Sequence, residues 1–191
     1  MKRLAFVIIV SLIHISCFSQ DWTDDQLTKA NTAADITIIS EDEKEAIMYI
    51  NLARLFPQDF AKIELEDVSD LGVNNPAYTR SLVKQLNAAT PVEPLYFDNT
   101  LYDVAKCFAK ESGTKGTVGH KRKNCPKGYN AECCSYGMKA GWDIALQWLI
   151  DDGVKDLGHR VICLDKTYTK IGLSIHPHKK YGTCAIADIA R

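Results

Sequence analysis

Apolar residues repeat with helical spacing in several stretches before residue 150 and with strand spacing near the end of the chain. Over 46–53, 101–108 and 142–149 they recur every three or four positions, which predicts amphipathic helices. Over 168–175 and 183–189 apolar residues alternate with others or form short runs, which predicts two antiparallel strands. Helices followed by a late pair of strands indicate an α+β fold.

Capping residues give the expected ends of these helices. Ser40 and Glu43 have the spacing of a capping box and predict a helix start. Asp98 or Asn99 is expected to cap the helix over 101–108, and Gly113 to end it. Further helices are expected over 58–65 and from 76 onward, each next to a proline.

The first residues read as a targeting signal. Lys2 and Arg3 precede an apolar run over 4–15, which is shorter than the roughly 20 residues that span a bilayer. We therefore predict a signal peptide over 1–19, no transmembrane segment, and a secreted, periplasmic or cell-surface protein. Lipid attachment at Cys17 is the weaker alternative, because His14 stands where such signals usually carry leucine.

The rest of the chain is expected to form one monomeric domain. A polar arm over 20–39 is expected to be loosely held, and the folded domain to occupy 40–191. Loss of the signal peptide changes the formal net charge from −1 to −3. Nucleic acid is therefore not an expected partner, because phosphate binding requires a concentrated basic surface.

Six of the seven cysteines lie outside the predicted signal peptide and constrain the exported domain further. Because exported proteins meet oxidising conditions, an even number of cysteines outside the signal peptide favours disulfides. A zinc–thiolate cluster is the alternative, but no C-x2-C pair is present. Neighbours in sequence are expected to bond to different partners, and sequence leaves the pairing open. The cysteines concerned are Cys107, Cys125, Cys133, Cys134, Cys163 and Cys184.

The stretch from residue 119 to 160 holds the candidate site residues. His120 and His159, with Glu132 and Asp151 between them, could hold zinc or another divalent metal if the fold brings them together. Their spacing alone does not require this, and taken singly each residue is more simply structural. Asp151 follows a predicted helix, where the helix dipole opposes a negative charge. We therefore expect Asp151 to have a partner.

The order of several short motifs resembles the CAP superfamily, which includes cysteine-rich secretory proteins, antigen 5 and the plant pathogenesis-related 1 proteins. The nearer resemblance is to its exported bacterial branch, and it covers roughly residues 41–190. It rests on Leu95–Leu101 with Ala105, Gly119-His120, Glu132 with Gly137, Trp148 with Asp151, Gly158-His159-Arg160, and Ile171-Gly172-Leu173.

The resemblance implies an α-β-α sandwich with a small antiparallel sheet between helices. It also implies a cleft in which two histidines and two acids bind zinc or another divalent metal; these match His120, Glu132, Asp151 and His159. Three departures from the family pattern are present: Ala131 replaces glycine, Cys133 replaces asparagine, and Asp151 is a carbon shorter than glutamate. Asp152 is the alternative second acid.

The resemblance indicates the function less directly than the fold, since members of one family differ in activity. The first hypothesis is an exported binding domain whose metal-capable cleft presents a site for a small molecule, a lipid or a protein. The alternative is a metal-dependent, peptidase-like hydrolase with Glu132 as general base. A cysteine nucleophile assisted by His120 or His159 is a third option. We expect binding and not catalysis, because neither an H-E-x-x-H helix nor a G-x-S-x-G motif is present.

Two smaller features complete the sequence. His176 and His178 flank Pro177 in an expected hairpin turn, where exposed histidines are more common than metal ligands. The basic run 121–123 beside His120 could attract an anion, although such runs are usually solvated.

Overall fold

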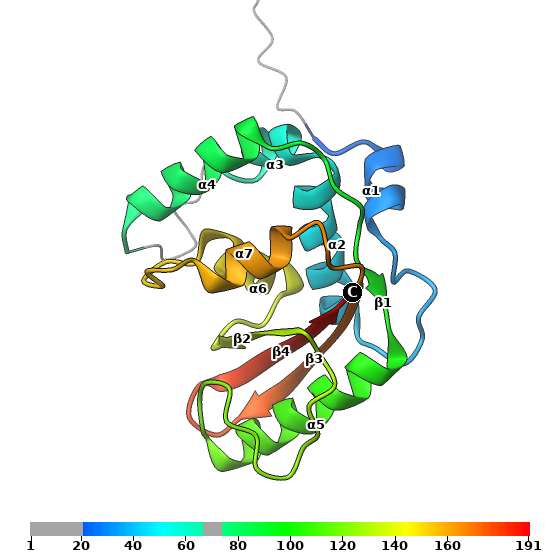
Figure 1. The fold of residues 1–191 in the computed structure, drawn as a ribbon, viewed down its shortest axis with the longest axis vertical. Coiled ribbons are helices and arrows are strands. Elements are labelled where there is room, and N and C mark those ends of the chain that lie inside the picture. The colour runs from blue at the N-terminus through cyan, green and yellow to red at the C-terminus, as the bar shows by residue number, and fades with distance from the viewer. Residues whose placement is uncertain (1–20, 67–73) are drawn as a thin grey trace, which may run out of the picture.

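The computed structural model describes residues 21–66 and 74–191, in which helices lie on both sides of one small sheet (Figure 1). The predicted signal peptide and Cys17 lie outside the described residues. Within them, no helix has the length and apolar content needed to cross a membrane. The elements are α1 (Asp24–Ala30), α2 (Glu41–Leu55), α3 (Pro57–Ile63), α4 (Pro76–Ala88), β1 (Tyr96–Phe97), α5 (Asn99–Lys115), β2 (Ala131–Tyr136), α6 (Gly141–Ile150), α7 (Gly158–Leu164), β3 (Lys170–His178) and β4 (Gly182–Ala190).

The sheet has the strand order β1-β3-β4-β2. The predicted hairpin is present as the antiparallel pair β3 and β4. Strand β2 pairs antiparallel with β4 and places Glu132 opposite Asp188. The short strand β1 runs parallel to β3, so the sheet is mixed and not purely antiparallel as expected.

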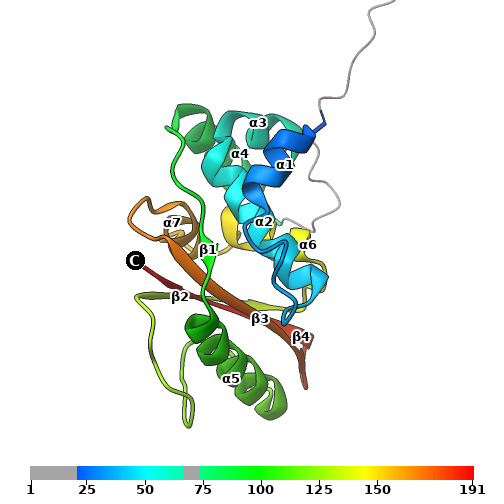
Figure 2. The ribbon, with the colours of Figure 1, turned by 90° about the vertical axis from the view of Figure 1, so that its right-hand side faces the viewer.

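Each face of the sheet is covered by helices, which confirms the α+β fold with an α-β-α arrangement. Helix α5 packs on one face, and α2, α6 and α7 lie on the other (Figure 2). The larger core includes the fully buried side chains of Trp148, Phe60 and Leu173, and a smaller cluster beneath α5 includes Phe108 and Ile186. The sheet is therefore buried between two helical layers.

The expected helix starts are confirmed, but one expected helix end is wrong. Ser40 and Glu43 form the predicted capping box of α2. The Asp98 carboxylate accepts a hydrogen bond from the Leu101 amide and caps α5. That helix continues past Gly113 to Lys115 and ends at Gly116, whose φ of 68° is left-handed. Gly113 therefore lies inside α5. The close packing of α5 on β3 requires glycine there, because a Cβ would overlap the Pro177 carbonyl oxygen.

The expectation of a loosely held arm is also wrong. Within 20–39, helix α1 begins at a capping box formed by Thr23, and Ala30 and Ala33 are fully buried. The Asn51 amide donates to the Ala30 carbonyl at 3.0 Å. Because these contacts bury backbone and side chains against α2, the arm is part of the packed domain.

Close packing between α5 and β3 depends on Gly172. A Cβ at this position would overlap the Leu101 carbonyl carbon and lie 2.6 Å from the Tyr102 Cα. Because both neighbours are backbone, Gly172→Ala is expected to lower the free energy of unfolding by about 3 kcal/mol. Urea denaturation measures this, with Gly128→Ala as control, where a Cβ would lie 3.7 Å from Val104. Equal stability of the two variants would contradict the expectation.

Candidate functional site

Strand β2 positions the candidate site. Side chains alternate along a strand, so Glu132 and Cys134 project from one face and Cys133 from the other. Sequence patterning did not predict this strand, because its central residues are buried on both faces and show no apolar alternation. Pairing with β4 fixes the register and holds Glu132 and Cys134 at the outer strand of the sheet.

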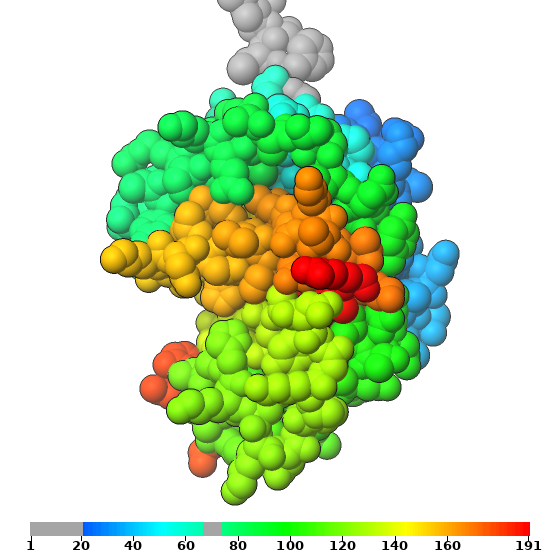
Figure 3. Space-filling model, viewed as in Figure 1, coloured from blue at the N-terminus to red at the C-terminus, as the bar shows by residue number. Residues whose placement is uncertain are grey.

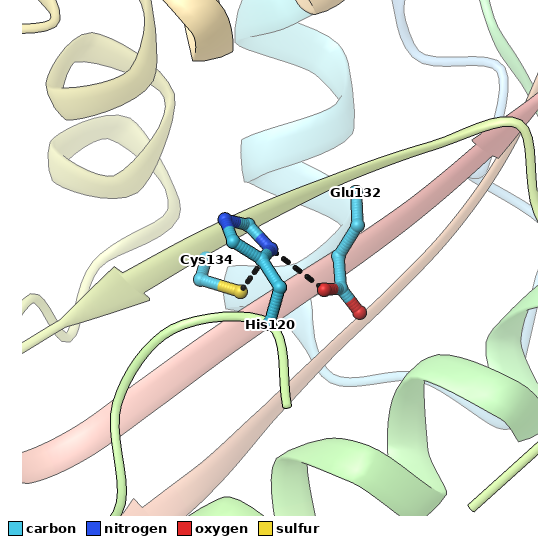
Figure 4. A group of neighbouring side chains, drawn as sticks. All are labelled: His120, Glu132 and Cys134. Carbon is cyan, nitrogen blue, oxygen red and sulfur yellow. Dashed lines mark hydrogen bonds and ion pairs between the residues drawn. The ribbon is translucent and has the colours of Figure 1, made fainter. Parts of the chain in front are cut away.

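His120 reaches the same face of β2 from the preceding loop (Figure 4). Its Nδ1 lies 2.7 Å from Glu132 Oε1 and 3.6 Å from Cys134 Sγ. The His120 side chain is 57% exposed, whereas that of Glu132 is 3% exposed. The group therefore has a buried base and an imidazole that is open to solvent.

The donor set of this group suits a divalent metal. In the part of the chain that the structure describes, one ligand atom each from His120, Glu132 and Cys134 lies within 4.8 Å of the other two. Imidazole nitrogen, carboxylate oxygen and thiolate sulfur are the three ligand types that zinc takes in proteins. Asp151 and His159 are not members of this group.

Asp151 and His159 form a second acid–histidine pair. Asp151 Oδ1 lies 2.7 Å from His159 Nδ1, and Oδ2 accepts from the His159 amide at 2.9 Å. Asp151 is buried at the end of α6 with a left-handed φ of 57°, so its carboxylate faces the start of α7. The expected partner of Asp151 is thus His159. Asp152 instead accepts from the Asn74 and Asn75 amides.

The two pairs contact neighbouring positions of β2. Glu132 bonds His120 on one face, and the Cys133 thiol lies 4.0 Å from the His159 carbonyl on the other. In Figure 3 the orange segment with α7 and the lime segment leading into β2 meet on one face of the molecule. The structure therefore forms two acid–histidine pairs, His120–Glu132 and Asp151–His159, beside β2.

Arg122 pairs with the buried acid of the site, a role that the sequence did not indicate. Its guanidinium bonds Glu132 and lies 2.6 Å from Asp188 Oδ1, and it stacks 4.5 Å from the ring centroids of Phe108 and Tyr129. The Arg122 side chain is 1% exposed. The expectation that the basic run is solvated is wrong for Arg122, because the sheet places two acids beside it.

Two buried carboxylates share this single arginine. Burial favours the neutral form of each, but hydrogen bonds from His120 and Arg122 lower the pKa of Glu132. Burial raises the pKa of Asp188 to about 7, and Arg122 only partly opposes this. The hydrogen bond to Glu132 raises the pKa of His120. A charged Glu132 therefore faces His120, while Asp188 holds a proton below about pH 7.

The proton on Asp188 makes the free energy of unfolding depend on pH. Between about pH 4 and 7 the folded protein holds a proton on Asp188 that the unfolded chain releases, so stability falls as pH rises through this window. We expect a slope of about 1 kcal/mol per pH unit from this group. Urea denaturation at several pH values should show a smaller fall for Asp188→Asn, whose residue 188 does not titrate. Parallel curves for the two proteins would contradict the assignment.

His176 and His178 differ from the expectation of exposed turn residues. Both lie within β3, and His178 is buried. His178 Nε2 donates to the Thr117 carbonyl, and Nδ1 accepts from the Lys180 and Tyr181 amides. His178 is therefore a structural residue with both ring nitrogens occupied by hydrogen bonds.

The cysteines divide into one disulfide and four thiols among the described residues. Cys107 and Cys125 form a disulfide that ties α5 to the loop before β2, which confirms the expectation of disulfide bonding. Cys133, Cys134, Cys163 and Cys184 are free and buried. Cys134 is the site residue that the sequence did not indicate, because its place beside Glu132 depends on strand β2, which shows no apolar alternation.

Residues 48–187 match the family described as "CAP: Cysteine-rich secretory protein family". The chain belongs to the CAP family. The match lies within the predicted domain and includes β1, β2, β3, most of β4 and both acid–histidine pairs. Comparison of this CAP domain with curated proteins finds no significant match. Where the family pattern has asparagine after the first acid, this CAP domain has Cys133, and it adds Cys134 to the metal-capable group.

Proposed function

We propose that this chain is an exported CAP domain of the bacterial type that binds zinc and presents the bound ion to a small-molecule, lipid or protein ligand. The proposed ligand atoms are His120 Nδ1, Glu132 Oε1 and Cys134 Sγ. The observation that carries the proposal is their mutual approach within 4.8 Å on one face of β2. The Asp151–His159 pair, predicted from the family pattern as a second pair of ligands, stays a prediction.

The surroundings favour a cation at this point. Glu132 has a lowered pKa and is therefore charged, and its Oε1 faces His120 whereas Oε2 is bonded to Arg122. Burial raises the pKa of the Cys134 thiol, so the thiolate needs a strong cationic partner to form. Zinc provides one, because a coordinated thiol loses its proton.

Binding is expected to compete with protons. The proton between His120 and Glu132 must leave before Nδ1 can bind a metal, and the Cys134 thiol must lose its proton as well. Zinc affinity should therefore increase as the pH rises. The exposed imidazole leaves one side of the ion open, which is where we place the ligand of the domain.

Two catalytic alternatives fit the geometry less well. A general base needs a free carboxylate, but Glu132 is bonded on one oxygen by His120 and on the other by Arg122. A cysteine nucleophile needs its base and the orienting acid on different ring nitrogens. Cys134 and Glu132 instead contact the same atom, His120 Nδ1. We therefore favour binding over hydrolysis.

Isothermal titration calorimetry of the domain without its signal peptide tests the proposal. The expected result is one zinc ion per chain with micromolar or tighter affinity at pH 7.5, and weaker binding at pH 5.5. Calcium, which prefers oxygen ligands, serves as the comparison metal and should not bind detectably. Absence of zinc binding under reducing conditions would refute the proposal.

A further inference from the structure

Two of the free thiols meet between β2 and α7. Cys133 projects from the face of β2 that α7 covers, and both Cys133 and Cys163 are fully buried in the same core. The Cys133 thiol lies 4.0 Å from the carbonyl oxygen of His159, which is four residues before Cys163 in α7. Residues four apart share one face of a helix. Cys163 is therefore on the helix face that meets Cys133.

Hydrogen bonds fix the backbone of α7 near Cys163. The Arg54 guanidinium donates to the Cys163 carbonyl at 2.7 Å and holds the end of α7 in place. The Cys163 side chain lies within hydrogen-bonding reach of the Cys133 thiol.

We infer that Cys133 and Cys163 form a second disulfide in the exported protein, joining β2 to α7. This bond would connect the strand that carries Glu132 to the helix that carries His159. The proposed disulfide lies on the face of β2 opposite to His120, and its formation does not depend on metal binding.

The other two thiols are not placed to pair. Cys134 and Cys184 share a face of the β2–β4 ladder, but Cys134 is opposite Ile186 and Cys184 is opposite Tyr136. Such diagonal neighbours are about 7–8 Å apart, whereas disulfide-bonded Cβ atoms are about 3.5–4.5 Å apart. Cys134 therefore remains a thiol, as zinc coordination requires, and Cys184 serves as an internal control.

The oxidant is a disulfide, either of an exported thiol–disulfide oxidoreductase or of oxidised glutathione. One cysteine thiolate attacks the oxidant and releases a thiolate, and the second cysteine then attacks the mixed disulfide and releases the other. The two cysteines lose two protons and two electrons, and the oxidant is reduced to two thiols. Because both sulfurs are buried in the fold, the reaction takes place during folding.

Peptide mapping tests the bond directly. The reduced, unfolded chain is refolded with oxidised and reduced glutathione, its free thiols are alkylated in denaturant, and trypsin is added without reduction. We expect peptide 128–139 to be joined to peptide 161–166, and peptide 181–191, with Cys184, to be alkylated. An alkylated peptide 161–166, or a link between 128–139 and 181–191, would overturn the inference.

Single substitutions show whether Cys133 or Cys134 forms the disulfide with Cys163. The link should persist in Cys134→Ser and disappear in Cys133→Ser. If the second variant does not fold, fragmentation of the linked wild-type peptide makes the same distinction. Reductant should also lower the melting temperature of wild type more than that of Cys163→Ala, which retains the Cys107–Cys125 bond. Equal shifts, or loss of the link in Cys134→Ser, would refute the assignment.

Discussion

Replacement of Arg122 by methionine is expected to destabilise the protein by about 3–5 kcal/mol at pH 8, because it leaves the buried acids Glu132 and Asp188 without their shared cation. Methionine retains apolar volume between the rings of Phe108 and Tyr129, so the loss should reflect charge more than packing. The free energy of unfolding from urea denaturation measures the effect.

The pH and a second substitution distinguish this explanation from a packing defect. At pH 5.5 Asp188 holds a proton, so the loss in Arg122→Met should be smaller than at pH 8. Adding Asp188→Asn should restore part of the stability at pH 8. Lys121→Met, at the exposed neighbouring position, should change stability by less than about 0.5 kcal/mol. A pH-independent loss in Arg122→Met would contradict the electrostatic explanation.

Loss of Cys134 is expected to reduce zinc affinity about 100-fold or more, since the ion loses its only sulfur ligand. His120→Ala should have an effect of similar size, measured by calorimetry under reducing conditions. His159→Ala should reduce affinity less than tenfold, because His159 bonds Asp151 and is not a member of the three-residue group.

Cys184→Ser is the matched control for the zinc experiment. Cys184 is a buried thiol on the same face of the β2–β4 ladder, but its thiol contacts the Ala109 carbonyl at 3.4 Å and not the site. Its substitution should leave zinc affinity within about twofold of wild type while removing a buried thiol of the same chemistry. If Cys184→Ser and Cys134→Ser weaken binding equally, the effect is one of folding and the ligand assignment is wrong.

Local sequence signals predicted much of the fold. The capping box at Ser40 and the cap at Asp98 are interactions within four residues, and the alternation around Leu173 belongs to a strand with covered faces. Strand β2 was not predicted because Glu132, Cys133 and Cys134 are all buried and hide the alternation. Recognition of β2 as a strand would have placed Glu132 and Cys134 on one face.

The candidate site was only partly predictable for a similar reason. The acid–histidine pairs His120–Glu132 and Asp151–His159 consist of the four residues that the family resemblance predicts as site residues. Arg122 looked like part of a solvated basic run, and its burial depends on Asp188, which only the β2–β4 register places beside Glu132. Such contacts between distant segments leave no local signal in one sequence.

X-ray absorption spectroscopy of the zinc-loaded domain tests the central claim most directly. Coordination by His120, Glu132 and Cys134 predicts one sulfur neighbour at about 2.3 Å from zinc, together with nitrogen and oxygen neighbours at about 2.0–2.2 Å. The sulfur signal should be absent from zinc-loaded Cys134→Ser and unchanged in Cys184→Ser. Wild-type zinc surrounded only by nitrogen and oxygen would contradict the claim and would favour the four predicted ligands, His120, Glu132, Asp151 and His159.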